Sequence, residues 1–434
     1  MADPVAAEVR LWDRRVGAVA EESSGRIAFE YDPAFARGGL EISPLHLPLS
    51  LKGPVTFPEL ARIPSFDGLP GLLADALPDR FGNALIARYF ALKGQPAAAL
   101  SPVQKLLYMG TRSMGALEFR PALRVAATPS EREPLEIAEL VADARRVVEG
   151  RPEVIVPEIM RIGASAGGAR PKAIILWNRA TDEVRSGFAK PHPGDEHWMI
   201  KFDGVGELDA PDPKPTPYNR IEYAYSQMAR EAGLDVPETR LLQERRLGHF
   251  MTKRFDREGE GKIHLHSLGG MHHVDYDQPG RFSYEQYLRT ALGLGLGYPA
   301  LEEAFRRAAF NLAAVNQDDH VKNFSFLMDE HGAWRLSPAY DLTFSKGAGY
   351  TRRHQMTLGG KTEGFVRDDL LALGGAFGLR KDGADIVDRV VAALGSWERY
   401  AREAGVPDDR ARAIAAEFRG PVLSRDRRPV PPVT

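Results

Sequence analysis

The sequence predicts an α+β protein in which a small β-rich N-terminal module is followed by a mixed lobe and a mostly helical C-terminal lobe. Short runs of strand-forming residues, separated by polar turns, open the chain at 9–12, 17–20 and 27–31. Apolar residues at helical spacing characterise its second half, at 284–292 and 301–314. We therefore expect three consecutive parts, at residues 1–125, 126–256 and 257–434.

The segments between these regions alternate between helix and strand signals. A helix is predicted to begin near Pro78, because a proline at the first helical turn precedes an apolar-periodic run. A second helical run, 136–148, follows two prolines at the first expected boundary. Strand-like apolar runs come next, at 173–177, 197–202 and 247–253.

Composition indicates a folded, water-soluble chain. The 434 residues are 43% hydrophobic and 27% charged, which suits a protein with substantial cores. There is no cysteine, so disulfides and thiolate metal sites are excluded, as is usual in a reducing cytoplasm. No signal peptide pattern or membrane-length apolar run is present, so we expect a cytoplasmic protein with no membrane partner. The net charge of −2 gives no overall attraction to nucleic acid.

The segment 316–325, Asn-Gln-Asp-Asp-His-Val-Lys-Asn-Phe-Ser, says most about function. Asp318 is followed five positions later by Asn323, and Asp341 comes in a Ser-Pro-Ala-Tyr-Asp-Leu segment. A carboxylate that orients a hydroxyl, with an amide and a second carboxylate that hold Mg²⁺, is typical of phosphoryl transfer from ATP. Taken singly, the acid is more often a helix cap and the amide a turn residue.

A glycine-rich stretch, 163–172, precedes the predicted strand 173–177. Such a loop allows backbone N–H groups to approach phosphate oxygens closely, and Arg170 or Lys172 would add positive charge. A surface turn before a strand is the alternative interpretation, since glycine-rich turns are common.

Two further segments would contact the phosphates and the adenine of a nucleotide. Lys201 ends a strand, and Glu222 lies on a following helix where it would hold the lysine ammonium near phosphates. Lys201 alone would otherwise be a solvated lysine at a strand end. The segment 253–255 follows another strand, where backbone groups would meet adenine and Phe255 would offer apolar surface or simply join the core.

Together these motifs resemble the HipA family of serine/threonine kinases, the toxins of bacterial type II toxin–antitoxin systems. The resemblance covers nearly the whole chain, since Leu77-Pro78-Asp79-Arg80 and Gly115-Ala116-Leu117-Glu118 are similar to the family's N-terminal subdomain. It implies a HipA-like, protein-kinase-like fold with two lobes. Asp318 would be the catalytic base, Asn323 and Asp341 the magnesium ligands, and Ser165 an autophosphorylated serine whose modification switches the kinase off.

The resemblance also implies a nucleotide site and partners. The nucleotide-binding residues would be Gly167, Gly168, Ala169, Arg170, Pro171, Lys172, Lys201, Lys253, Arg254, Phe255, His320, Val321, Lys322, Asn323, Tyr340 and Asp341. The partners would be a protein substrate, for which an aminoacyl-tRNA synthetase is the candidate, and a HipB-like helix-turn-helix antitoxin that contacts DNA. Two alternatives remain: a co-repressor with secondary catalysis, and a small-molecule kinase with the same phosphate chemistry.

Two departures from the best-known persistence toxin of that family stand out. Asp319 replaces a glycine, which creates two adjacent acids, but only Asp318 has the kinase separation from Asn323. The segment 264–277 carries four histidines and two aspartates. We interpret it as a polar loop near the substrate cleft, with a zinc site as the weaker alternative because the histidines lack strong metal-ligand spacing.

Overall fold

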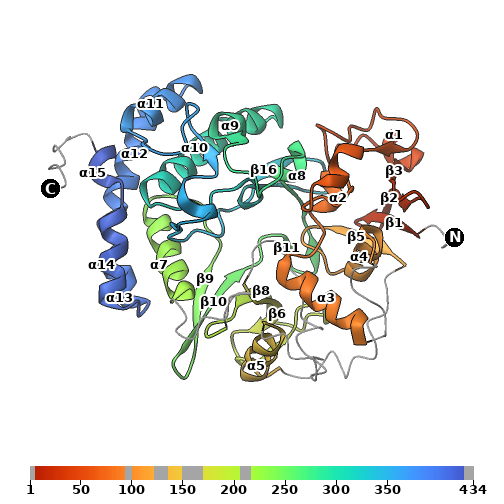
Figure 1. The fold of residues 1–434 in the computed structure, drawn as a ribbon, viewed down its shortest axis with the longest axis horizontal. Helices are drawn as coiled ribbons and strands as arrows, with labels where there is room; N and C mark the ends of the chain where they lie inside the picture. The colour runs from red at the N-terminus through yellow and green to blue at the C-terminus, as the bar shows by residue number, and fades with distance from the viewer. Residues whose placement is uncertain (1–4, 93–99, 122–134, 149–169, 206–216, 425–434) are drawn as a thin grey trace. The chain divides into compact units, whose positions relative to one another are not determined.

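A computed structural model describes residues 5–92, 100–121, 135–148, 170–205 and 217–424 (Figure 1). Two compact units divide the chain. Unit 1 comprises residues 1–216, 242–275 and 325–333, and unit 2 comprises residues 217–241, 276–324 and 334–434. The predicted α+β class is confirmed. Because both units draw on separate stretches of chain, the division into three consecutive parts stays a prediction.

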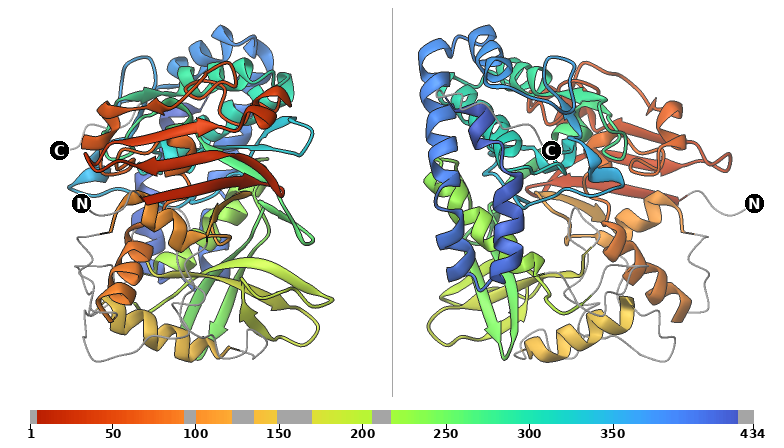
Figure 2. Two further views of the ribbon diagram at one scale, coloured as in Figure 1. Left: turned by 90° about the vertical axis from the view of Figure 1, so that its right-hand side faces the viewer. Right: turned by 60° about the vertical axis from the view of Figure 1, so that its left-hand side comes forward.

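The N-terminal module of unit 1 contains an antiparallel sheet, whose first strands are drawn in red in Figure 2. The order is β4-β3-β2-β1-β5, with β1 at Val5–Leu11, β2 at Arg14–Glu21, β3 at Ile27–Tyr31, β4 at Val55–Thr56 and β5 at Leu117–Arg120. Trp12 and Asp13 join the first two strands, both with positive φ, as a two-residue hairpin turn requires. Alternate apolar side chains such as Val9 and Phe29 are buried.

Short helices complete the module. They are α1 (Pro33–Arg37), the 3-10 helix η1 (Pro58–Arg62), α2 (Gly71–Ala74), α3 (Arg80–Leu92) and α4 (Pro102–Met109). The helix predicted near Pro78 is α3, and the Asp79 side chain accepts a hydrogen bond from Gly82 N at 2.6 Å in its first turn. Ser101 caps α4 through a capping box with Gln104.

A second sheet in unit 1 carries the strand that ends at Lys201. Four strands wholly inside this unit follow the order β7-β6-β8-β10, at Val184–Ser186, Lys172–Asn178, Asp195–Lys201 and Leu247–Lys253. The helix α5 (Ile137–Val148) lies against this sheet (Figure 1), where Leu140 joins Ile175 and Trp198 in one buried cluster. The strand β9 (Thr239–Glu244) precedes β10 in the chain, and β11 (Arg257–Glu258) and β12 (Gly261–Lys262) follow it.

The histidine-rich segment is not the polar loop that the sequence suggested. It forms the strand β13 (His264–Ser267), which pairs with β15 (Ser325–Met328), and the short helix α8 (Leu268–His272). His264 and His266, two residues apart on one face of β13, are buried against the N-terminal module. His264 Nε2 donates to Ile42 O at 3.0 Å, and His266 Nδ1 donates to Asp75 at 2.7 Å. These side chains are therefore structural.

The zinc alternative gains no support. Within the part of the chain that the structure describes, no three His, Asp or Glu side chains gather as they would to hold a metal ion. Instead, Asp75 also accepts from the Ser267 amide at 2.7 Å and its hydroxyl at 2.6 Å. The module is thus held to β13 by a buried polar network centred on Asp75.

Unit 2 is mostly helical. Its helices are α7 (Tyr218–Glu231), α9 (Tyr284–Gly293), α10 (Tyr298–Ala313), α11 (Arg367–Ala376), α12 (Arg380–Leu394), α13 (Trp397–Glu403), α14 (Asp408–Glu417) and α15 (Gly420–Leu423). Short pieces complete it: β14 (Phe282–Ser283), β16 (Trp334–Leu336), β17 (Met356–Thr357), and the 3-10 turns η3 (Val321–Asn323) and η4 (Tyr350–Arg352).

The core of unit 2 fixes the end of α10. Tyr225, from α7, is fully buried between Phe310 and Trp397, with ring centres 6.2 and 5.2 Å away. Its hydroxyl donates to Ala314 O at 2.7 Å, so α7 holds the backbone that leaves α10 toward Asp318. Among the described helices, none has the length and apolar character needed to span a membrane.

Buried histidines predict acid sensitivity of unit 1. Burial lowers the pKa of His264 and His272 to about 4 and that of His273 to about 3. The unfolded chain restores a pKa near 6.5, so unfolding takes up protons once the pH falls below that value. Stability present above pH 6.5 is therefore lost as the pH falls toward 4, on the order of 3 kcal/mol for His264.

Thermal unfolding followed between pH 7.5 and 4.5 measures this loss. In His264→Gln, which keeps a donor toward Ile42 without the titrating ring, the midpoint should fall less steeply with pH than in the parent protein. Equal slopes for the two proteins would contradict the role assigned to His264.

Candidate active site

Two loops that carry the predicted catalytic residues are held side by side in unit 2. Ser345 N donates to Val315 O at 3.1 Å, and Gln317 N donates to Ser345 O at 2.9 Å. A second tie joins the two loops, because the Tyr340 hydroxyl donates to Lys322 O at 2.6 Å. The loop that contains Asp318 and Asn323 is therefore tied at two points to the segment that contains Asp341.

The second loop is anchored to α10. Arg307, a buried residue of that helix, donates to Ser337 O at 2.6 Å and pairs with Glu303 at 2.9 Å. Ala339 N donates to Asp235 O at 2.7 Å. Asp341 itself has a φ of 56°, a conformation that non-glycine residues adopt seldom and often at functional sites.

The two adjacent acids have different surroundings. The Asp318 side chain is 40% exposed, whereas Asp319 is fully buried. Asp319 accepts from the Tyr284 hydroxyl at 2.6 Å, from His354 Nδ1 at 2.9 Å and from Gln355 N at 2.7 Å. Because these donors occupy Asp319, this buried acid has a structural role, and the catalytic role of Asp318 stays a prediction.

Asn323 closes the loop that Asp318 begins. Its Nδ2 donates to Asp318 O at 2.9 Å, so Oδ1 is the amide atom that a cation would take. An amide oxygen here and the Asp341 carboxylate are of the hard oxygen type that Mg²⁺ prefers, so their residue types fit the predicted metal.

His320 is a neutral group beside Asp318. Burial lowers the pKa of His320 to about 4, although the Asp341 charge opposes this shift. Its Nε2 lies 3.9 Å from Asp318 Oδ1, and its ring centre lies 5.3 Å from that of Tyr276. At neutral pH the imidazole is therefore uncharged, and it adds no positive charge that would lower the proton affinity of the neighbouring carboxylate.

Unit 1 holds the lysines that the sequence assigned to phosphate binding. Lys172 and Lys201 are opposite each other in the paired strands β6 and β8. The Lys172 ammonium lies 3.0 Å from Asp79, and both side chains are 3% exposed, so this charge is neutralised inside the protein. Lys201 is nearly buried and its ammonium lies 5.7 Å from the Phe250 ring centre. Glu222 lies on α7 in unit 2, so its pairing with Lys201 stays a prediction.

The predicted adenine segment is fixed by its own charges. Lys253 Nζ donates to Glu196 at 2.8 Å, and Arg254 forms a bidentate pair with Asp256 at 2.8 and 2.6 Å. Arg254 is buried and Phe255 is half-buried. The expected role of residues 253–255 in adenine binding therefore rests on their backbone.

Only the end of the glycine-rich stretch can be placed. Arg170 and Pro171 lead directly into β6, and Pro171 O accepts from Phe202 N at 3.1 Å. Ser165 and 167–169 lie outside the described residues, and their predicted roles remain predictions.

Three structural partners escaped the sequence interpretation. Tyr284 and His354 are each 35 residues from Asp319, and Asp79 lies far from Lys172 in the chain, so no local spacing reveals these contacts. The adjacent acids 318–319 gave the one usable signal, since like charges side by side favour different roles for the two.

Comparison with known proteins identifies similar sequences over most of the chain. A family model described as the HipA-like C-terminal domain matches residues 164–423, and one described as the HipA N-terminal domain matches residues 7–120. A protein of Sinorhizobium fredii named "Putative kinase Y4dM" is 26% identical over 351 residues, 77% of this chain and 76% of that protein. A "Putative kinase" of Haemophilus influenzae is 30% identical over 167 residues, 34% of this chain and 47% of that protein.

A solved structure has a similar fold. The HipA of Shewanella oneidensis MR-1, determined in a complex with HipB and operator DNA, aligns with a TM-score of 0.65. The alignment covers 96% of both chains at 19% identity.

Amide substitutions at the adjacent acids should separate their roles. Asp319→Asn leaves one acceptor oxygen for three donors, so the free energy of unfolding should fall by about 1–3 kcal/mol. Asp318→Asn at a partly exposed position should change it by less than about 0.5 kcal/mol. Urea unfolding of both variants provides the measurement, and equal losses would contradict the structural role of Asp319.

Proposed function

We propose a function for this chain from one premise: it belongs to the HipA family. The C-terminal family model alone covers more than half of the chain, the fold matches that of a solved HipA, and the relatives are named as kinases. The chain is thus kinase-like. We infer that it is an ATP-dependent serine/threonine protein kinase. The partly exposed Asp318 carboxylate, on a loop tied to that of Asp341, carries this inference.

Asp318 would act on the substrate hydroxyl. Its carboxylate would accept the hydroxyl proton while the oxygen attacks the γ-phosphorus in line and the bond to the β-phosphate oxygen breaks, which releases ADP. Mg²⁺, when held by Asn323 and Asp341, neutralises charge on the phosphates. Neutral His320 beside Asp318 would place no positive charge there to weaken that carboxylate as a proton acceptor.

Lys201 would supply the positive charge in unit 1. Its nearly buried ammonium is suited to phosphate oxygens, because a charge in a poorly solvated site interacts more strongly than one in water. We therefore propose Lys201 as the phosphate-binding lysine and the backbone of 253–255 as the adenine contact.

Membership of the family supports a role as a toxin. The Shewanella HipA was solved with HipB and operator DNA, and we propose a comparable HipB-like antitoxin for this chain, through which DNA is contacted indirectly. The proposed substrate is a protein, with an aminoacyl-tRNA synthetase as the candidate. The small-molecule kinase alternative predicts that labelled phosphate does not enter protein, whereas the co-repressor alternative predicts binding to the antitoxin with only secondary catalysis.

Removal of the proposed base should abolish phosphoryl transfer but leave ATP binding intact. Asp318→Ala should bind ATP with nearly parental affinity, whereas its phosphorylation rate should fall at least about 100-fold, the usual contribution of a positioned base. Calorimetric ATP titration and ³²P incorporation provide the two measurements. Parental incorporation by this variant would overturn the assignment.

Self-phosphorylation distinguishes a protein kinase from a small-molecule kinase. With labelled ATP and no added substrate, the parent chain should incorporate phosphate, and Ser165→Ala should lose most of it. Phosphate at this serine adds about two negative charges, which would oppose ATP phosphates. Mass spectrometry of the labelled peptide identifies the site, and label on another residue would remove Ser165 from the proposal.

A further inference from the structure

Two N-terminal sequence motifs have no role in the proposed chemistry, yet both contact its nucleotide segments. We propose that Asp79 and the Gly115 loop are positioning elements that set the affinity of unit 1 for ATP. This inference rests on the proposed kinase function. It assigns the N-terminal module a part in nucleotide binding, through contacts that all lie within unit 1.

The first contact joins Asp79 to Lys172. Asp79 lies at the start of α3 and accepts from Gly82 N, while its other oxygen is 3.0 Å from the Lys172 ammonium. Lys172 directly follows the glycine-rich stretch and lies opposite Lys201 in the sheet. The pair therefore fixes the point where the proposed phosphate loop enters β6, next to the proposed phosphate-binding lysine.

The second contact joins the loop 110–118 to Asp256. The Gly115 amide donates to this buried carboxylate at 2.7 Å, and the same carboxylate holds Arg254 of the proposed adenine segment. Gly115 has a φ of +74°, and a side chain there would lie 3.0 Å from Leu265 N. A glycine is thus needed for the amide to approach Asp256.

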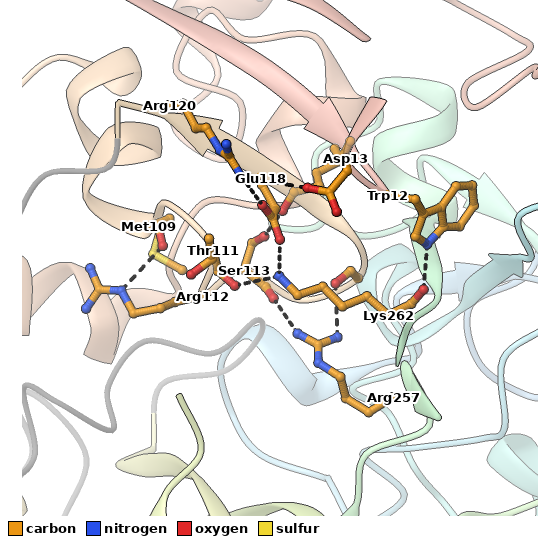
Figure 3. Close-up of polar contacts among 12 residues, drawn as sticks. Trp12, Asp13, Met109, Thr111, Arg112, Ser113, Glu118, Arg120, Arg257 and Lys262 are labelled. Carbon is orange, nitrogen blue, oxygen red and sulfur yellow. Dashed lines mark hydrogen bonds and ion pairs between the residues drawn. The ribbon is translucent and has the colours of Figure 1, made fainter. Parts of the chain in front are cut away.

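Arg257 and Lys262 extend this second contact (Figure 3). Arg257 donates to Ser113 O at 3.2 Å and to Gly115 O at 3.0 Å, as well as to Asp256 at 2.8 Å. Lys262 donates to Thr111 O at 2.9 Å and to Glu118 at 2.8 Å. The loop is therefore held by Arg257 and Lys262, which follow the adenine segment in the chain.

The charged side chains in these two contacts lie in the protein interior, where an unpaired charge is costly. Asp79, Lys172, Asp256 and Arg254 are almost entirely buried, so loss of one partner leaves an uncompensated charge without water. The neighbouring backbone must then move to let water reach that charge. Such movement would displace the entry to β6 or residues 253–255, which changes ATP affinity but leaves Asp318 and the metal ligands in place.

Charge removal at constant size tests the proposal. In full-length Asp79→Asn and Asp256→Asn, the Kd for MgATP, measured by calorimetry, should rise about tenfold, within the range of energetic coupling between sites. The rate at saturating ATP should stay within about twofold. Glu22→Gln is the matched control, because it removes a carboxylate of the same module from an exposed pair with Arg26. It should bind ATP as the parent does.

The outcomes separate this inference from the proposed function. A parent chain that binds no ATP refutes the kinase. A parent that binds ATP, together with folded variants of unchanged Kd, refutes only the positioning role. A fall in the saturated rate at unchanged Kd also refutes it.

A measurement on the unmodified protein covers the case in which a variant does not fold. Coupling is reciprocal, so ATP bound near residues 253–255 must stabilise the contacts of the Gly115 loop. Amide hydrogen exchange in peptides from 110–118 and 79–83 should slow when ATP is added, whereas exchange around Glu22 should not change. Protection confined to 253–257 would overturn the proposal.

Discussion

The fully buried carboxylate of Asp319 is the constraint on which the candidate catalytic loop depends. It joins residues from α9, from the loop after α10 and from the segment before β17, which are separated by 35 positions or more in the chain. Asp319 also raises the pKa of Tyr284, after burial itself, so this tyrosine stays a donor. With one acid fixed in the interior, its neighbour is directed toward solvent. A structural and a catalytic carboxylate can therefore be adjacent without competing for partners.

Local patterns predicted most of the fold. The hairpin strands, α3, α5, α7 and the strand that ends at Lys201 all carry periodicity or capping signals within a few residues. The histidine segment was assigned wrongly, because polar composition suggested a loop while burial against Asp75 and Ile42 makes it a strand. Whether such a segment forms a strand or a loop depends on partners far away in the same sequence, which a single sequence does not reveal.

The same limit applies to the candidate site. The separations between Asp318, Asn323 and Asp341 are local enough to indicate phosphoryl-transfer chemistry, and the family resemblance rests on these residues together with the other motifs along the chain. Lys172 pairs with Asp79, and Arg254 pairs with Asp256. These ion pairs form only in the folded chain, so the sequence does not reveal them. Sequence thus identified residues of the right type, whereas the structure shows which of them are held by buried ion pairs, as Lys172 and Arg254 are.

The contact between Asp75 and Ser267 has a consequence for synthesis on the ribosome. The two residues are 192 positions apart, so the N-terminal module leaves the exit tunnel well before its partner strand exists. At typical elongation rates this interval is about 10–40 s. Throughout it, the face of the module that will receive β13 is exposed to solvent and to other nascent chains. Chaperone binding during translation would protect that face until residue 267 emerges.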